Sequence, residues 1–246
     1  MSYYNIYRRT RRSARQERTK TSAIHLRTKT SALHNFLHLI PSMQNIKNVI
    51  FDLGGVLLNL DIAAAEKAFA EIGFQDFKQL FGKGQVTSFI KDYEIGALDD
   101  NQFVKEIKKV VKAENADDVA IAAWNAMLLD FPAERIEFLH KLQTKYRLFL
   151  FSNTNSLHLQ SFRKTYSAAF NQAILDDHFE KAYYSHEIKL RKPDKEAFEY
   201  VINDSKLNPA ETLFIDDTLP NVEGARKAGL QAIHLKPGMS ITELGL

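Results

Sequence analysis

Cysteine is absent from the 246-residue sequence, and its absence excludes several classes of site. The chain can have no disulfide framework, no thiolate metal site and no cysteine nucleophile. Apolar runs are also short, because none approaches the roughly 18 residues that a membrane-spanning helix needs. The sequence therefore predicts a soluble globular protein, with no membrane partner and with the cytoplasm as its default location.

Acidic side chains are nearly missing from residues 1–42, where Glu17 stands against nine of the 33 lysines and arginines. The rest of the chain carries the other 24 basic and 29 acidic residues, so the net charge of +3 comes from this arm. The arm lacks apolar periodicity, which predicts a mostly disordered extension. Three interpretations are open: an arm that binds nucleic acid or an anionic surface, a targeting peptide, or a tail before a natural start at Met43. The third fits best, and nucleic acid is disfavoured as a partner.

A short apolar run, NVIF, occupies residues 48–51 and ends at Asp52 and a glycine pair, which predicts a buried strand. The chain then changes character, because residues 61–130 form an all-helical block. Several of its segments start with acids or end at glycine, as helices do. The predicted helices cover residues 61–73, 84–96, 99–113 and 117–130.

After Pro132, apolar runs alternate with helical patterns. Strands that alternate with helices of this length indicate right-handed βαβ units and a parallel sheet covered on both faces. The predicted fold is α/β: a doubly wound, Rossmann-like core of residues 43–60 and 131–246, with an inserted all-helical cap domain of residues 61–130. The predicted strands are 147–151, 179–185, 211–215 and 231–235, and the helices are 132–146, 157–166, 194–204 and 221–229.

Polar residues stand where the predicted strands end. In an open parallel sheet the ligand site lies beyond the carboxyl ends of the strands, so these side chains should meet at one edge. One more candidate is a lysine that precedes the helix near Pro193. The candidate site residues, in chain order, are Asp52, Ser152, Asn153, Lys192, Asp216 and Asp217.

This set of side chains has a chemical logic. Neighbouring carboxylates repel one another unless a cation neutralises them, and oxygen ligands without cysteine or clustered histidine point to Mg²⁺. A cation, a lysine and hydrogen-bond donors suit a phosphoryl group, whose oxygens carry charge in the transition state. A carboxylate can then act as the nucleophile, so the pattern predicts phosphoryl transfer through an aspartyl-phosphate.

Four ordered motifs support this interpretation and cover the chain from about residue 46 to its end: FDLGGV at 51–56, FSNTN at 151–155, RKPD at 191–194 and FIDDTLPNVEGA at 214–225. Together they resemble the haloacid dehalogenase superfamily of Mg²⁺-dependent hydrolases. The stretches SNTNSLH and IDDTLPNVEGA are most similar to its small sugar-phosphatase branch, which includes α-D-glucose-1-phosphate phosphatases. The helical block corresponds to that family's mobile cap, and its segment EIGALDDNQF at 94–103 resembles a recurring cap sequence.

The resemblance implies roles for the catalytic and phosphate-binding residues. Asp52 matches the nucleophile, which also binds the metal. Ser152, with Asn153 beside it, matches the donor to the phosphoryl oxygens. Lys192 matches the cation that holds nucleophile and phosphate together.

The resemblance also implies a set of metal ligands. The carboxylate of Asp52 and the backbone carbonyl of Gly54 match two of them. Asp217 matches the direct ligand of the fourth motif, and Asp216 is expected to bind directly or through water. Asn221 matches an outer position.

One position departs from the family pattern. Phosphatases of the superfamily usually carry a second aspartate two residues after the nucleophile, as proton donor to the leaving oxygen. Here that residue is Gly54, and Asp61, Glu94 and His186 are the candidate substitutes.

The expected function is hydrolysis of small phosphorylated metabolites, above all sugar phosphates, by a monomer or homodimer. The alternatives are a 2-haloacid dehalogenase, a phosphosugar mutase, and a non-catalytic protein whose basic arm binds nucleic acid. The acid pair at 216–217 disfavours the dehalogenase, since a site without a cation would leave three carboxylates repelling one another. Gly54 disfavours the mutase, which must move a proton in each cycle.

Overall fold

The computed structural model describes residues 45–75, 77, 86–111 and 116–246, and residues 45–246 form one compact unit. The predicted disordered extension of residues 1–42 lies outside the described residues. So do small parts of two predicted helices, at 84–85 and 112–113. No helix of the described residues is long and apolar enough to cross a membrane.

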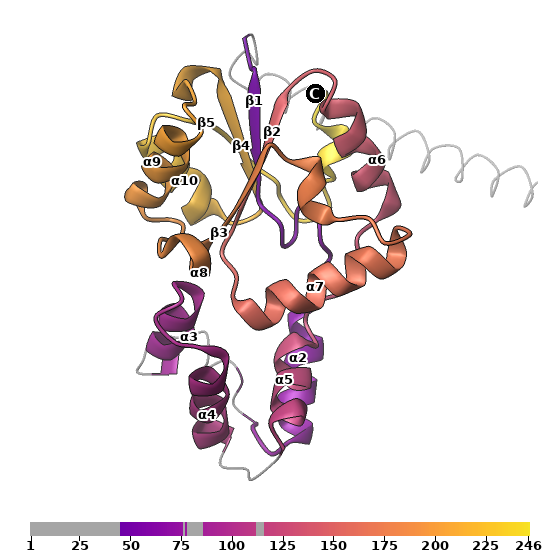
Figure 1. Cartoon of the computed structure of the whole chain (residues 1–246), viewed down its shortest axis with the longest axis vertical. Helices are drawn as coiled ribbons and strands as arrows, with labels where there is room; N and C mark the ends of the chain where they lie inside the picture. Colours follow the sequence, from indigo (N-terminus) through magenta and orange to yellow (C-terminus); the bar gives the residue numbers. More distant parts are fainter. Residues whose placement is uncertain (1–44, 76, 78–85, 112–115) are drawn as a thin grey trace, which may run out of the picture. The chain divides into compact units, whose positions relative to one another are not determined.

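The centre of this unit is a five-stranded sheet in the order β3-β2-β1-β4-β5, with every neighbouring pair parallel (Figure 1). The apolar run at 48–51 lies in the middle and is buried on both faces, as a parallel strand between helical layers must be. Phe51, its last residue, stands between Leu150 and Ile215 in register. The strands are β1 (Asn48–Phe51), β2 (Arg147–Ser152), β3 (Lys181–Tyr184), β4 (Thr212–Asp216) and β5 (Gln231–His234).

Helices cover both faces of the sheet. Figure 1 shows α9 and α10 on one side and α6 and α7 on the other. The apolar side chains of α9 and α10, such as Phe198 and Val222, pack against Ile50, Phe149 and Phe214 of the strands. The helices of this part are α6 (Ala133–Leu142), α7 (Ser156–Ala169), α8 (Ser185–Ile188), α9 (Lys195–Asp204) and α10 (Leu219–Lys227), with 3-10 turns η2 (Leu175–His178), η3 (Pro209–Glu211) and η4 (Ile241–Glu243).

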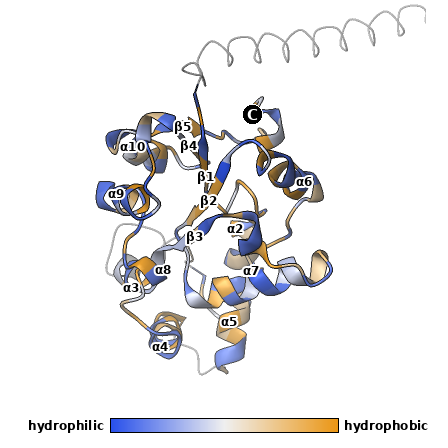
Figure 2. Ribbon diagram, turned by 45° about the horizontal axis from the view of Figure 1, so that its top comes forward, coloured by the Kyte–Doolittle hydropathy of each residue, from blue (hydrophilic) through white to orange (hydrophobic). Residues whose placement is uncertain are grey.

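A helical insertion separates β1 from α6. It has an apolar cluster of its own, in which the ring of Phe103 stacks on Tyr93 at 3.9 Å and meets the edge of Trp124 at 4.9 Å. Figure 2 shows the alternation of polar and apolar residues along these helices, which is the pattern of amphipathic helices around a shared core. The described helices of the insertion are α2 (Ile62–Glu71), α3 (Val86–Glu94), α4 (Asp100–Val111) and α5 (Asp117–Asn125).

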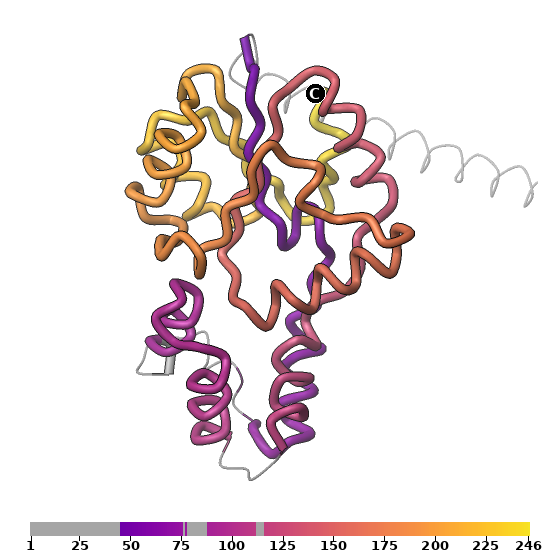
Figure 3. Tube along the Cα trace, in the orientation of Figure 1, coloured from indigo at the N-terminus to yellow at the C-terminus, as the bar shows by residue number. Residues whose placement is uncertain are grey.

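The chain enters and leaves the insertion side by side, as the trace in Figure 3 shows. The backbone of Asn59 donates to Asp130 (2.9 Å) and accepts from Leu129 (3.0 Å). Leu60 and Leu128 form an antiparallel bridge next to them. These two short segments are the covalent connections between the insertion and the sheet.

Candidate active site

Three segments that are distant in sequence bring a lysine and two carboxylates together. Asp52 follows β1 directly, Asp216 is the last residue of β4, and Lys192 lies in the loop before α9. The Nζ atom of Lys192 lies 2.6 Å from Oδ1 of Asp52 and 2.7 Å from Oδ2 of Asp216. The parallel register explains the meeting, because neighbouring strands β1 and β4 end at the same edge.

Lys192 is buried, with 1% of its side chain exposed. Although burial lowers the pKa of Lys192, the neighbouring Asp216 and Asp52 raise it above its ordinary value, so the ammonium stays charged. The rings of Phe151 and Phe214, each little more than 5 Å from Nζ, also attract the ammonium through cation–π interactions.

Asn153 fixes the main chain of Lys192. Its Oδ1 accepts from the Lys192 N–H (2.9 Å), and its Nδ2 donates to the Lys192 carbonyl (2.8 Å). The peptide bond between Lys192 and Pro193 is cis. Both ends of the Asn153 amide therefore contact the loop that carries Lys192, and one N–H of this amide stays available for the phosphoryl oxygens to which the resemblance assigns it.

Three carboxylates gather beside this lysine. Ligand oxygens of Asp52, Asp216 and Asp217 all lie within 4.8 Å of one another, and they are the acid cluster found among the described residues. A Cβ atom built on Gly55, which has a φ of +73°, would lie 2.1 Å from Oδ2 of Asp217. Only glycine permits this backbone conformation and this close approach together.

Asp216 and Asp217 have different surroundings. The carboxylate of Asp216 is buried and accepts from Lys192, from the Thr218 N–H (2.8 Å) and from Nδ2 of Asn221 (3.0 and 3.1 Å to its two oxygens). Oδ1 of Asp217 accepts from the Thr218 hydroxyl (3.1 Å). Asp216 therefore holds the lysine and the start of α10, while Asp217 lies against Gly55.

The electrostatics of the cluster favour a bound cation. Burial raises the pKa of Asp52 to about 7; Lys192 opposes the rise, and Asp216 and Asp217 add to it. Burial and the charge of Asp216 likewise raise the pKa of Asp217. One ammonium does not offset three carboxylates, and a small hard cation between their oxygens would complete the neutralisation. The donor set thus fits the Mg²⁺ that the sequence predicted.

Ser152, the last residue of β2, is buried beside Asn153 at the same edge of the sheet. The chain after it is held rigidly, because the Ser185 hydroxyl accepts from the Thr154 N–H (2.9 Å) and donates to the Thr154 carbonyl (3.0 Å). Asn155 then caps α7 through the N–H of His158 (3.0 Å). Helix capping therefore falls to Asn155 and does not occupy Ser152.

Two of the three candidate proton donors already have structural partners. Asp61 caps α2 by accepting from the N–H groups of Ala63 (2.9 Å) and Ala64 (3.2 Å). Glu94 is ion-paired with Arg191, and burial raises the pKa of its carboxyl despite that partner. Asp61 thus has a capping role and Glu94 an ion-pairing role in this structure.

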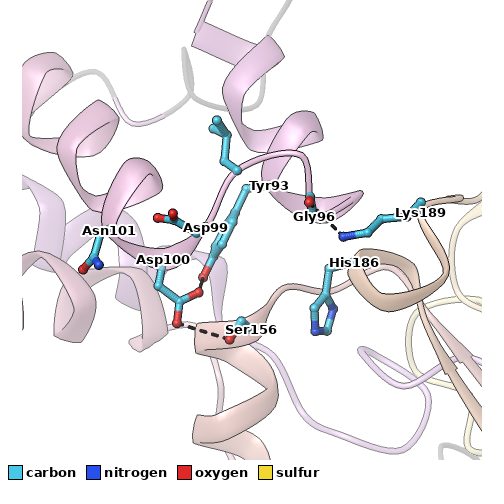
Figure 4. A pocket seen from close by; sticks show the side chains of 9 residues that line it. Tyr93, Gly96, Asp99, Asp100, Asn101, Ser156, His186 and Lys189 are labelled. Carbon is cyan, nitrogen blue, oxygen red and sulfur yellow. Dashed lines mark hydrogen bonds between the residues drawn. The ribbon is translucent and has the colours of Figure 1, made fainter.

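His186, the third candidate, lines a cavity of about 460 Å³ between the insertion and the starts of α7 and α8 (Figure 4). Its Nδ1 atom is buried and has no hydrogen-bond partner in the described part of the chain. Asp100 bridges the cavity wall, accepting from the Tyr93 hydroxyl (2.7 Å) and the Ser156 hydroxyl (3.2 Å). The walls are mostly polar and include Tyr93, Asp99, Asp100, Asn101, Ser156, His186 and Lys189.

The chain belongs to the haloacid dehalogenase-like hydrolase family, whose model matches residues 46–229. This match confirms the resemblance drawn from the four motifs, and with it the α/β fold class. The protein is therefore an enzyme of a hydrolase family.

Individual relatives agree with the family assignment. D-ribitol-5-phosphate phosphatase from Bacteroides thetaiotaomicron is 28% identical over 193 residues, which are 78% of this chain and 93% of the relative. A family enzyme of known structure from the same organism, crystallised with magnesium and inorganic phosphate, is 35% identical with a TM-score of 0.75, over 82% of this chain and all of that one. A predicted family hydrolase from Porphyromonas gingivalis is 30% identical with a TM-score of 0.72, over 79% of this chain and 93% of that one.

Proposed function

We propose that this enzyme is a Mg²⁺-dependent phosphatase of small phosphorylated metabolites, namely sugar or polyol phosphates, and that it works through an aspartyl-phosphate on Asp52. The observation that carries the proposal is the buried meeting of Asp52 with Lys192 and two further carboxylates. The relative that acts on D-ribitol 5-phosphate and the one crystallised with magnesium and phosphate support it.

The proposed metal ligands are the carboxylates of Asp52 and Asp217 and the carbonyl of Gly54. The oxygens of Asp216 already accept from Lys192 and Asn221, and this carboxylate is proposed to bind the metal directly or through water. When bound, Mg²⁺ neutralises these carboxylates and the charge on the phosphoryl oxygens. Asn221 keeps Asp216 in place.

The proposed reaction has two displacements at phosphorus. A carboxylate oxygen of Asp52 bonds to phosphorus while the ester P–O bond breaks, and the leaving oxygen takes a proton from solvent water. Water then bonds to phosphorus, its proton passes to solvent, and the P–O bond to Asp52 breaks, which releases inorganic phosphate and restores the carboxylate. Lys192 steadies Asp52 and its ammonium attracts the phosphoryl group, to which the Ser152 hydroxyl donates.

The rest of the substrate is proposed to bind under the helical insertion. Residues 61–130 would act as a cap domain on the core of residues 43–60 and 131–246. The polar cavity beside Ser156 and His186 has room for a small hydroxylated chain, and the carboxylates of Asp99 and Asp100 on its walls could accept from hydroxyl groups. This chemistry favours sugar and polyol phosphates over apolar esters.

The dehalogenase alternative fits this site less well. A dehalogenase attacks carbon with the same aspartate and without a cation, which would leave three neighbouring carboxylates with Lys192 alone. The solved 2-haloacid dehalogenase from Pseudomonas syringae pv. Tomato is 19% identical with a TM-score of 0.51, a likeness of fold alone.

The test is hydrolysis of an aryl phosphate by the full chain, with Mg²⁺ or with EDTA, followed by a panel of D-ribitol 5-phosphate, hexose phosphates and a nucleoside monophosphate. Asp52→Asn keeps the size of the side chain but removes the nucleophile, so kcat should fall about 1000-fold or more. Asp118→Asn changes an exposed acid at the start of α5 and serves as the matched control with near-normal kcat. Hydrolysis that persists in EDTA or in Asp52→Asn would contradict the mechanism.

A further inference from the structure

Two polar contacts join the helical insertion to the loop that carries Lys192. Nε of Arg191 lies 2.9 Å from Oε2 of Glu94, and its NH2 atom lies 2.8 Å from the same oxygen. Two residues from Glu94 and two from Arg191 lies a second contact, in which the Lys189 ammonium donates to the Gly96 carbonyl (2.8 Å), as Figure 4 shows. We call these four residues, Glu94 and Gly96 of the insertion and Lys189 and Arg191 of the core, the latch.

The backbone on both sides of the latch is shaped for close contact. Gly96 has a φ of +62°, and a Cβ atom there would lie 2.3 Å from both the His186 carbonyl oxygen and the Lys189 Nζ. Lys189 itself has a φ of +63°, a left-handed conformation that a residue with a side chain rarely adopts. A strained lysine opposite an obligatory glycine indicates a specific junction and not a chance surface contact.

The ion pair of the latch is well shielded from water. The side chains of Arg191 and Glu94 are 25% and 21% exposed, compared with 43% and 50% for the Arg147–Glu180 pair on the surface of the core. Shielded charges attract one another more strongly and are screened less by salt. The guanidinium of Arg191 also reaches Glu94 through two of its nitrogens, which restricts its orientation.

The core also holds the loop that the latch contacts. Asn153 grips the main chain of Lys192 from one side. On another side, a Cβ atom on Gly224 would lie 2.3 Å from the Pro193 carbonyl oxygen, so α10 packs directly against the loop. The latch adds a contact from the insertion to the residue that immediately precedes Lys192.

We propose that Glu94 is a positioning residue. It holds Arg191, and through Arg191 it fixes the position of Lys192, when the insertion lies against the core. The inference rests on the proposed function in treating Lys192 as catalytic. The insertion is tied to the core at Leu60 and Leu128 on its connecting side, and the latch closes its other side. Loss of the Glu94–Arg191 ion pair removes one of the contacts that hold the loop of Lys192. The rate of catalysis therefore depends on the contact between the insertion and the core.

A positioning role and a proton-donor role for Glu94 make different predictions. A proton donor matters for an alkyl phosphate, whose leaving oxygen must be protonated, but hardly for an aryl phosphate, whose leaving group departs unprotonated. A residue that positions Lys192 affects both substrates equally, because both need the same phosphoryl site. The comparison therefore separates the two roles.

The experiment uses the full chain with Mg²⁺ and measures kcat and KM for an aryl phosphate and for D-ribitol 5-phosphate. Glu94→Gln should lower kcat about tenfold to a hundredfold for both substrates, as a small misplacement of a catalytic group does. The double variant Glu94→Arg with Arg191→Glu, which exchanges the two charges, should recover much of the lost kcat. Arg191→Lys keeps the charge but loses the two-nitrogen contact, so its kcat should lie between those of the unmodified enzyme and Glu94→Gln. Backbone amides of residues 185–192 should exchange hydrogen faster in Glu94→Gln.

Asp117→Asn is the matched control, because it breaks an ion pair of similar length (2.7 Å to Lys108) that lies inside the insertion. It should leave kcat and the exchange of residues 185–192 unchanged. Normal kcat and normal exchange in Glu94→Gln would overturn the proposal, and so would a loss confined to the alkyl phosphate. An inactive unmodified enzyme would count against the proposed function instead, and hydrogen exchange would still test the latch.

Discussion

Position 54 shows how one residue limits the chemistry of the site. A Cβ atom on Gly54 would lie 2.7 Å from Cδ1 of Leu60, so this leucine covers the place where the family's usual acid would start. The clash involves the far end of a side chain that is 38% exposed and can rotate away at little cost. The absence of a side chain at residue 54 is therefore not enforced by rigid packing.

Gly54→Asp is expected to increase kcat for alkyl phosphates by up to about 100-fold, because it supplies a proton donor to the leaving oxygen. Gly54→Asn displaces Leu60 in the same way but carries no acid, so its kcat should stay near that of the unmodified enzyme. Steady-state rates on D-ribitol 5-phosphate with saturating Mg²⁺ measure the difference. Equal gains in both variants would show that the displaced leucine, and not the proton, matters.

A buried histidine of helix α7 connects the core to the helical insertion. The ring of His158 stacks on Trp124 of the insertion at 4.8 Å, and its Nε2 lies 3.1 Å from the Trp124 carbonyl oxygen. Burial lowers the pKa of His158 to about 4, although the hydrogen bond to this carbonyl opposes the shift. The neutral ring is therefore part of the packing between α5 and α7.

The lowered pKa of His158 makes stability depend on pH in a defined direction. The unfolded state takes up the proton near pH 6.5 and the folded state only near pH 4, so this stabilisation is present above pH 6.5 and is lost as the pH falls to 4. The shift corresponds to about 3 kcal/mol of unfolding free energy. His158→Phe keeps an aromatic ring without the titration, so its urea unfolding should vary less over this range; an unchanged pH dependence would contradict the assignment.

Most elements were predictable, because their signals are local. Apolar runs identified the strands and 3.6-residue periodicity identified the helices, while α8 and the turn η2, each four residues long, are too short to show a period. The parallel topology then placed the strand-end residues at one edge. The hydrogen bonds from the Asn153 side chain to the Lys192 main chain and the pairing of Glu94 with Arg191 were not predictable, because they join segments 39 and 97 residues apart and no strand-end pattern marks them.

At the scale of the whole described unit, the acid cluster makes stability depend on a cation. With the pKa of Asp52 raised to about 7, the metal-free protein loses stability as the pH rises from about 4 through 7, because the folded state holds that proton more tightly. A cation that binds only the folded, ionised cluster reverses this loss. The effect of Mg²⁺ should therefore be larger at pH 8 than at pH 6.

Thermal unfolding with Mg²⁺ or EDTA at the two pH values measures this linkage. Mg²⁺ at 100 times its Kd should add about 2.7 kcal/mol to the unfolding free energy, which raises Tm by several degrees. Asp217→Asn should fold in EDTA and lose most of the Mg²⁺-dependent shift. Glu199→Gln, which alters an exposed ion pair with Lys195 on α9, is the control that should keep it. A shift that survives in Asp217→Asn would place the cation elsewhere.

The paired segments at the base of the insertion have a consequence for the evolution and engineering of this enzyme. Since the chain departs at Leu60 and rejoins beside it at Leu128, any replacement segment with adjacent ends could be spliced there without moving the strands of the sheet. The part of the chain proposed to select the substrate is thus exchangeable as a module, provided that the latch is kept. A transplanted module would therefore need a carboxylate for Arg191 and a glycine for Lys189.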